Sequence, residues 1–258
     1  MRLFDTHCHL DFEVFDEDRK ALISRCAELG VDKLLIPAIN VESLNKIEAL
    51  SREYEGVYIA SGIHPFFVNE TSLSQIGRLE DWLESRSGYQ KLVAVGEIGL
   101  DKLCSVDYGL QQQVFERQLI LAERFNLPVI IHNRKSDQAI LKAIDSIACL
   151  TGVIHGFTGS IETARQFIDR GFKLGIGGAV TWSNARKVKS MVEQLPLESM
   201  VLETDAPDMS PQWLKGQRNT PLELFEVVRF LSELRGESID VISSQLYRNG
   251  CAVFEIAA

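Results

Sequence analysis

Short apolar runs recur eight times along this chain of 258 residues, and a longer amphipathic segment follows each of them. The runs are four to six residues long and apolar at mostly consecutive positions, which is typical of parallel strands buried on both faces. Eight strands that each precede a helix predict a (β/α)8 barrel of the TIM type, whose usual length is about 250 residues. The predicted strands cover residues 3–6, 33–37, 57–62, 92–97, 128–132, 152–155, 173–176 and 200–203.

A doubly wound open sheet is the competing fold, and the glycine pattern argues against it. A nucleotide-binding sheet of that kind carries G-x-G-x-x-G directly after its first strand, and no such motif follows residues 3–6. The glycines at 175, 177 and 178 come only with the seventh predicted strand, so we expect them to allow close backbone packing at the barrel mouth. No repeat, linker or block of charge interrupts the pattern, so residues 1–258 are predicted to form a single barrel domain.

Composition excludes several classes of protein. Hydrophobic residues make up 45% and charged residues 24%, which argues against a disordered chain. With 27 basic and 36 acidic side chains, the net charge of −9 argues against a general nucleic-acid coat protein. It does not exclude a nuclease, because bound metal ions can supply positive charge where it is needed.

Cysteine usage and hydropathy favour a cytoplasmic protein. The five cysteines are odd in number and widely spaced, so we expect reduced thiols and neither a disulfide framework nor a zinc ribbon. No apolar run approaches the ~18 residues of a membrane span, and Asp5 and His7 interrupt the N-terminal segment too early for a signal peptide. The chain gives no sign of an obligate protein partner.

The histidines lie at the carboxyl ends of predicted strands. They follow the first, third, fifth and sixth strands, and Glu97 and Asp205 occupy equivalent places after the fourth and eighth. Any one of them alone could cap a strand or begin a turn. In a barrel, however, these ends converge on the face that carries the active site, so their joint placement predicts a functional cluster. The five histidines are His7, His9, His64, His132 and His155.

The residue types predict a metal site. The two-residue period of a strand points His7 and His9 to the same side and Cys8 away. Imidazoles with carboxylates suit Zn²⁺, Mn²⁺ or a similar transition metal better than an all-oxygen Mg²⁺ cage, although Mg²⁺ stays an alternative. Six such residues exceed the needs of one tetrahedral zinc, so we expect two divalent ions with one bridging carboxylate. The six are His7, His9, Glu97, His132, His155 and Asp205.

Seven short blocks resemble the signature blocks of the TatD family of metal-dependent hydrolases, and in particular its YjjV-like branch. They occur in the family's order over nearly the whole chain. The blocks are DTHCH at 5–9, GIHP at 62–65, GEIGLD at 96–101, IHNR at 131–134, HGFTG at 155–159, ETDAP at 203–207 and RNTP at 218–221.

This resemblance implies an amidohydrolase-superfamily barrel with a dinuclear metal site. Characterised relatives are DNases, some of which act as 3′→5′ exonucleases on single strands. By position, the resemblance implies that His7, His9 and Asp205 hold one ion, that His132 and His155 hold the other, and that Glu97 bridges. Two loops depart from the family pattern, at residues 102–107 and 208–211. Both are expected to touch substrate, so they concern specificity more than metal binding.

Loops at the predicted mouth carry cations and aromatics that could meet a nucleic acid. We expect most of them to be solvated rim residues or plugs of the barrel mouth. Arg134, two residues beyond a predicted ligand, is the exception, and His64, Arg134 and Arg218 are the candidate substrate-binding residues. The full set is Lys102, Arg134, Lys135, Lys215 and Arg218, with Phe66, Phe67, Phe157, Trp182 and Trp213.

The leading hypothesis is a phosphodiesterase that acts on DNA ends, most favourably single-stranded, by metal-activated water. Glu97 and Asp205 are its candidate catalytic residues, with Asp205 as the proton acceptor. In a second hypothesis, the same site hydrolyses the ester or amide bond of a small metabolite, or an aminoacyl ester. The excess of acidic over basic side chains favours this second hypothesis slightly. A third, a metal-binding interaction protein without catalysis, leaves a proton-accepting aspartate without a purpose.

Overall fold

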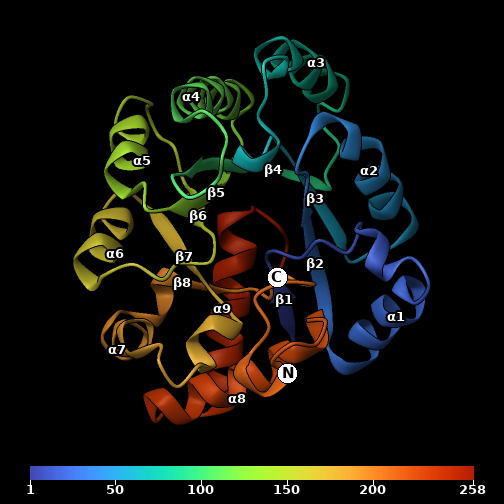
Figure 1. The fold of residues 1–258 in the computed structure, drawn as a ribbon. Coiled ribbons are helices and arrows are strands. Elements are labelled where there is room, and N and C mark those ends of the chain that lie inside the picture. Colours follow the sequence, from blue (N-terminus) through green and yellow to red (C-terminus); the bar gives the residue numbers. More distant parts are fainter.

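A computed structural model describes residues 1–258 and contains a ring of eight parallel strands surrounded by helices (Figure 1). Strands adjacent in sequence are adjacent in the sheet, in the order β1 to β8. The predicted (β/α)8 barrel is therefore confirmed. The strands are β1 Leu3–Asp5, β2 Val31–Pro37, β3 Val57–Ser61, β4 Leu92–Asp101, β5 Val129–Arg134, β6 Gly152–Ile154, β7 Phe172–Ile176 and β8 Met200–Leu202.

Helices follow every strand, and two of them follow the last one, as the sequence predicts. No helix has both the length and the apolar character needed to cross a membrane. The helices are α1 Arg19–Leu29, α2 Leu44–Glu53, α3 Ser72–Ser85, α4 Tyr108–Phe125, α5 Asp137–Ile144, α6 Ile161–Ile168, α7 Arg186–Gln194, α8 Leu224–Arg235 and α9 Ile239–Val253.

The fourth strand is longer than predicted. It continues past Glu97 to Asp101, and β5 continues past His132 to Arg134. The two strands stay paired in this extension, with Gly99 opposite His132. At Gly99, whose φ is 146°, a Cβ atom would lie 2.0 Å from the His132 carbonyl oxygen, so only glycine allows the backbones to approach this closely. The extension carries Asp101 up beside His132.

The barrel closes between β1 and β8 at its carboxyl end. Beyond the regular strands, the Asp205 N–H donates to the His7 carbonyl oxygen at 2.8 Å, and the His9 N–H donates to that of Ala206 at 2.7 Å. These bonds join the segments that follow the two strands. The closure therefore places three of the predicted site residues side by side.

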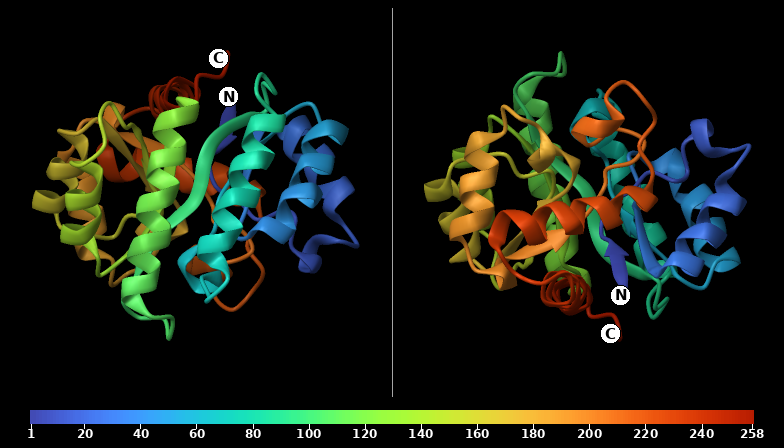
Figure 2. Two further views of the ribbon diagram at one scale, coloured as in Figure 1. Left: turned by 90° about the horizontal axis from the view of Figure 1, so that it is seen from above. Right: turned by 90° about the horizontal axis from the view of Figure 1, so that it is seen from below.

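The opposite end of the barrel is filled by side chains. Phe4, Leu35 and Ile130, from three different strands, belong to an eleven-residue core cluster. Tyr247 of α9 and Phe254, the residue directly after this helix, belong to the same cluster. The Phe4 and Phe254 rings meet edge to face, with centroids 6.1 Å apart. Figure 2 shows α9 at one end of the barrel and the loop that follows β8 at the other. Only the carboxyl end is therefore open to a substrate.

Candidate metal centre

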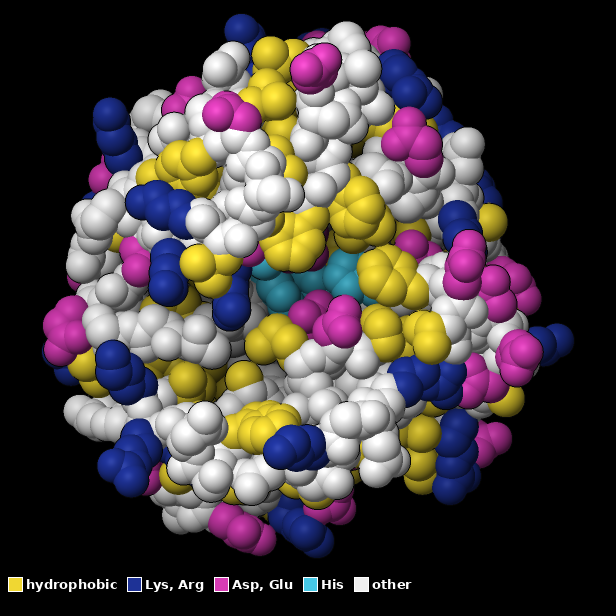
Figure 3. Space-filling view, viewed as in Figure 1, with side chains coloured by type: hydrophobic (Ala, Val, Ile, Leu, Met, Phe, Trp, Pro, Cys, Tyr) yellow, Lys and Arg dark blue, Asp and Glu magenta, His cyan; other side chains and the backbone are white.

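A cavity of about 420 Å³ opens at the carboxyl end of the barrel. Viewed into this end, the histidines form the floor of a hollow, and apolar side chains lie along much of its rim (Figure 3). His7 lies beneath the floor and is fully buried. The cavity is lined by His9, Phe12, Ile39, His64, Phe66, Phe67, Glu97, Asp101, His132, Asn133, Arg134, His155, Gly156, Asp205, Asp208 and Met209.

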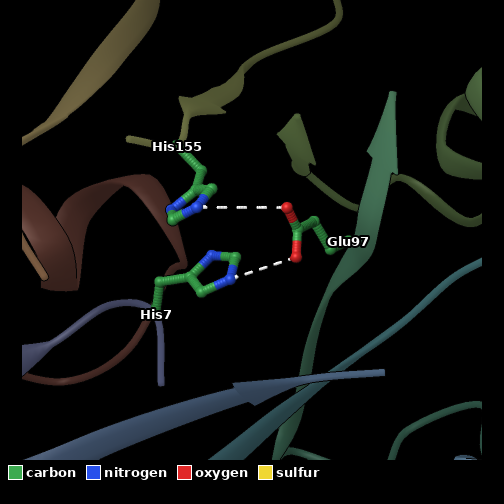
Figure 4. Close-up of side chains that lie close together, drawn as sticks. All are labelled: His7, Glu97 and His155. Carbon is green, nitrogen blue, oxygen red and sulfur yellow. Dashed lines mark ion pairs between the residues drawn. The ribbon is translucent and has the colours of Figure 1, made fainter. Parts of the chain in front are cut away.

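Glu97 lies at the centre of the cluster, and its two carboxylate oxygens face different imidazoles. Oε2 is 3.2 Å from His7 Nε2 and 3.6 Å from His9 Nε2. Oε1 is 3.1 Å from His132 Nδ1 and 4.0 Å from His155 Nε2. Figure 4 shows this division for His7 and His155, each of which faces a separate oxygen of Glu97. One carboxylate thus spans two groups of ring nitrogens.

Asp205 spans the same space from the other side. Its Oδ1 lies 3.6 Å from His7 Nε2 and 3.5 Å from His9 Nε2, whereas Oδ2 lies 3.6 Å from His155 Nε2. Asp205 adopts a left-handed backbone conformation with φ 57°, which is uncommon for a residue other than glycine and often marks functional sites. The hydrogen bond from its N–H to His7 helps to hold this turn.

The donor atoms fit divalent metal ions. Three groups each place three candidate ligand atoms within 4.8 Å of one another, and Glu97 and His7 each belong to two of the groups. Buried imidazole nitrogens and carboxylate oxygens are the ligands of zinc and related transition metals. The groups are His7, Glu97 and His155; His7, His9 and Asp205; and His64, Glu97 and His132.

Electrostatics keep the two central carboxylates ionised. Burial is the largest influence on Glu97 and opposes its charge, but the facing imidazoles, His64 and His7 foremost, hold the pKa of Glu97 well below its ordinary value. Burial likewise opposes the charge of Asp205, yet the neighbouring histidines, His155 first, lower the pKa of Asp205. Both side chains are therefore negative at neutral pH, as metal ligands must be.

Sequence reasoning missed two carboxylates that orient the histidines. Asp101 Oδ2 lies 2.9 Å from His132 Nε2, and Glu203 Oε1 lies 3.0 Å from His155 Nδ1. Each ring thereby turns its other nitrogen toward Glu97, an arrangement common around metal-bound histidines. Both residues stand inside the family blocks, at the end of GEIGLD and the start of ETDAP, which was the available signal.

The side chain of Glu203 fits beside Gly175 only because glycine has no side chain. A Cβ atom at Gly175 would lie 2.1 Å from Glu203 Oε2. A Cβ atom at Gly177 would lie 2.5 Å from the Glu203 carbonyl oxygen, so the predicted close backbone packing of this glycine segment at the barrel mouth is confirmed.

Two buried glutamines of α4 hold the loops beside the site. Gln118 accepts from the Ile63 N–H at 2.7 Å and donates to the Ile63 carbonyl oxygen at 3.1 Å. Gln111 makes the same pair of bonds with the Asp101 backbone, at 2.8 and 3.1 Å. The two residues are seven positions apart, or about two helical turns, so they lie on one face of α4. This face of α4 therefore positions the backbone of Ile63, directly before His64, and that of Asp101.

His64 points a donor into the cavity. Its Nδ1 accepts from the Phe66 N–H at 3.1 Å, so the neutral ring carries its proton on Nε2. Nε2 lies 3.4 Å from Glu97 Oε1. His64 is thus set as a hydrogen-bond donor facing the central carboxylate, which suits its predicted role in substrate binding.

The two predicted substrate-binding arginines are placed differently. Arg134 lines the cavity and extends into solvent. Arg218 does not reach it: its guanidinium pairs with Asp18 at 2.5 and 3.0 Å and donates to the Val14 carbonyl oxygen at 2.7 Å. The structure thus departs from the expectation for Arg218, because the acidic residue before α1 engages the guanidinium away from the cluster.

Among the predicted aromatics, only two line the cavity. Phe66 and Phe67 do so with 54% and 41% of their surface exposed. Phe157 is buried, Trp182 donates to a loop carbonyl, and Trp213 donates to Glu223 near the start of α8. The expectation that most aromatics at the mouth are plugs or rim residues therefore holds for these three.

The fold and the cluster together define a class of protein. A (β/α)8 barrel that gathers buried histidines and carboxylates at its carboxyl mouth is typical of metal-dependent hydrolases. The model of one family, described as TatD related DNase, matches residues 4–255. The chain belongs to this TatD family.

Individual relatives support the same assignment. The chain is 40% identical to the uncharacterized metal-dependent hydrolase YjjV of Escherichia coli K12, over 99% of this chain and 98% of that one. It is 32% identical to the uncharacterized metal-dependent hydrolase YabD of Bacillus subtilis 168, over 98% and 99% of the two chains. The crystal structure of Escherichia coli YjjV superposes with a TM-score of 0.94, at 38% identity and 99% coverage of both chains. These matches confirm the resemblance to the YjjV-like branch.

Proposed function

We propose that this hydrolase cleaves the terminal phosphodiester bonds of single-stranded DNA. The observation that carries the proposal is that Glu97 and Asp205 each span two groups of imidazoles at the floor of an open cavity. Such a floor suits a pair of divalent ions, which phosphodiesterases use on both sides of the reacting phosphorus. The name of the family, a DNase family, supports the same substrate.

Within this proposal, the chain provides two sets of ligands. By the family resemblance, His7, His9 and Asp205 would hold one ion, and His132 and His155 would hold the other. Glu97, whose two oxygens face different imidazoles, would serve both ions. Ions bound there lower the pKa of water and offset negative charge on the phosphoryl group.

The remaining steps are proton and phosphate handling by side chains. Asp205, ionised and close to both groups of imidazoles, accepts the proton of the attacking water. His64 donates from Nε2 to a phosphoryl oxygen, and Arg134 at the cavity wall pairs with the phosphate. Phe66 and Phe67 offer exposed rings on which unpaired bases stack, worth roughly 1–3 kcal/mol per base.

The metal content tests the ligand sets. After removal of metal and reconstitution with excess Zn²⁺ or Mn²⁺, the protein is expected to hold about two ions per chain, following the two-metal arrangement. Elemental analysis of the desalted protein measures this ratio. A value that stays near zero would contradict the metal centre, and a value near one would remove the bridging role of Glu97.

Strand specificity tests the substrate. We expect the Mn²⁺-loaded protein to degrade a single-stranded oligonucleotide at least about tenfold faster than the same sequence in a blunt duplex. The reason is that an unpaired end enters the cavity without the few kcal/mol needed to unstack and unpair a base. Initial rates on end-labelled strands give the ratio. Equal rates on the two substrates would exclude entry of a single unpaired end.

A second candidate substrate is the ester or amide of a small metabolite, or an aminoacyl ester. Two observations favour it: the net charge of −9, and the carboxylate of Asp208 in the cavity wall. Negative groups at the mouth disfavour a polyanion. The same assays decide between the candidates, because turnover of small esters without cleavage of either DNA would replace the phosphodiesterase proposal.

A further inference from the structure

We propose that a second recess beside the metal centre binds the phosphate adjacent to the scissile one. The recess has a volume of about 270 Å³ and shares Asn133, Arg134 and His155 with the central cavity. It extends from the β5 end toward the loop that follows β6, where Phe157 and Thr158 line it. The inference rests on the proposed function, since it assigns a second position on the same strand.

Two cations line the recess without a carboxylate partner. Arg134 and Lys135 are both exposed, and neither has a carboxylate oxygen within 4.0 Å of its charged nitrogens. The recess contains one carboxylate, that of Asp137, which accepts from the Asn133 side chain at 2.7 Å. The charge of the recess is therefore positive, and its cations are free to meet an anion.

Hydrogen bonds hold the backbone turn that carries Arg134 and Lys135. Lys135 adopts a left-handed conformation with φ 52°, which costs a lysine energy and persists only where surrounding bonds hold it. Ser136 supplies two of those bonds: its Oγ donates to the Arg134 carbonyl oxygen at 3.0 Å, and its N–H donates to Asn133 Oδ1 at 3.3 Å. The Lys102 N–H donates to the same Arg134 oxygen at 3.1 Å. The cations thus stand on a preorganised turn.

The other charged side chains at the barrel mouth also favour a path of the DNA strand toward this recess. Asp208 lines the central cavity, and Asp11 and Glu13 line a separate recess on the side of Phe12. Lys and Arg side chains gather instead on the left of the hollow in Figure 3, on the side of β5 and β6. Lys46 and Arg218 also line the recess on the side of Phe12 and balance its two carboxylates, so it has no net positive charge. A polyanion that leaves the metal centre is therefore attracted toward the Arg134 and Lys135 side and not toward the Phe12 side. Arg134 stands at the boundary between the two phosphates, and Lys135, which lines only the recess, meets the second.

Two dinucleotides that differ by one phosphate test this subsite. Both d(TpT) and d(pTpT) contain one cleavable diester, and only d(pTpT) carries a phosphate on the neighbouring nucleotide. The Mn²⁺-loaded parent is expected to show a KM for d(pTpT) about tenfold lower than that for d(TpT), the scale of one charge-assisted contact. Lys135→Ala is expected to abolish this preference. Lys142→Ala, which removes an exposed lysine of the adjacent helix α5 that lines neither cavity, is expected to keep it.

Failure of the subsite and failure of the proposed function give different results. If the parent cleaves both dinucleotides with equal KM, or if Lys135→Ala keeps the preference, the subsite is wrong and the phosphodiesterase stands. If neither dinucleotide is cleaved, the phosphodiesterase is wrong, and calorimetric binding of the same two dinucleotides decides the subsite. Tighter binding of d(pTpT) that is lost in Lys135→Ala supports it, and equal binding overturns it.

Discussion

Replacement of Glu97 by alanine is expected to remove most of the bound metal and to lower kcat by at least about a thousandfold. Loss of a group that only supports a ligand costs roughly 10–100-fold in metal affinity or activity, and Glu97 touches the cluster directly. Its Oε2 faces His7, and its Oε1 faces His132. Removal of this one side chain therefore weakens both halves of the proposed centre. Metal stoichiometry and kcat, measured on the same preparation, check the prediction.

Glu97→Gln is the matched control for shape, because it retains one coordinating oxygen and the side-chain volume. We expect it to lose less metal than Glu97→Ala and to fold normally, as judged by circular dichroism. The bridging role is refuted if Glu97→Ala keeps two ions per chain and most of the parental rate.

Asp205→Asn is expected to retain most of the metal and yet lose at least about a hundredfold in kcat. General-base contributions are typically ~10²–10⁴-fold. Asparagine keeps the shape and one coordinating oxygen but has neither the charge nor the basicity. The parental carboxylate is ionised at neutral pH, because the surrounding imidazoles outweigh burial and lower the pKa of Asp205, so its oxygens are free of a proton and able to accept one. The measurement again pairs metal stoichiometry with kcat.

Asp208→Asn controls for the loss of one negative charge near the centre. Asp208 lines the same cavity but belongs to none of the three candidate ligand groups. Its substitution is expected to change kcat by far less than that of Asp205. If Asp205→Asn holds its metal and is nearly as active as the parent, Asp205 is not the base and the proposed proton transfer fails.

The fold was predictable to a large extent because its signals are local. Eight apolar runs with intervening helical patterns indicate a barrel without any knowledge of contacts. The chief difference concerned β4, which was expected to end at residue 97 and extends to Asp101. That extension depends on pairing with β5, opposite His132 and Arg134, and a periodicity argument treats each strand separately.

The candidate site was predictable at the level of which residues gather. His7, Glu97 and Asp205 follow different strands, and the convergence of strand ends in a barrel is sufficient to bring them together. Arg218 shows the limit of this reasoning. Its place in a loop at the mouth said nothing about Asp18, an acidic residue 200 positions away that engages its guanidinium.

The sequence by itself determined the order of strands and helices, and with it the end of the barrel at which histidines and carboxylates collect. Hydrophobic periodicity carries this information because it is repeated within each short segment. Only the tertiary structure decided which atoms face one another. Glu97 and His132 are 35 positions apart, and their 3.1 Å approach depends on the stagger between β4 and β5, which Gly99 permits. The orientation of each ring by Asp101 or Glu203 depends likewise on how neighbouring strands pack, because a side chain's direction is set by all the elements around it.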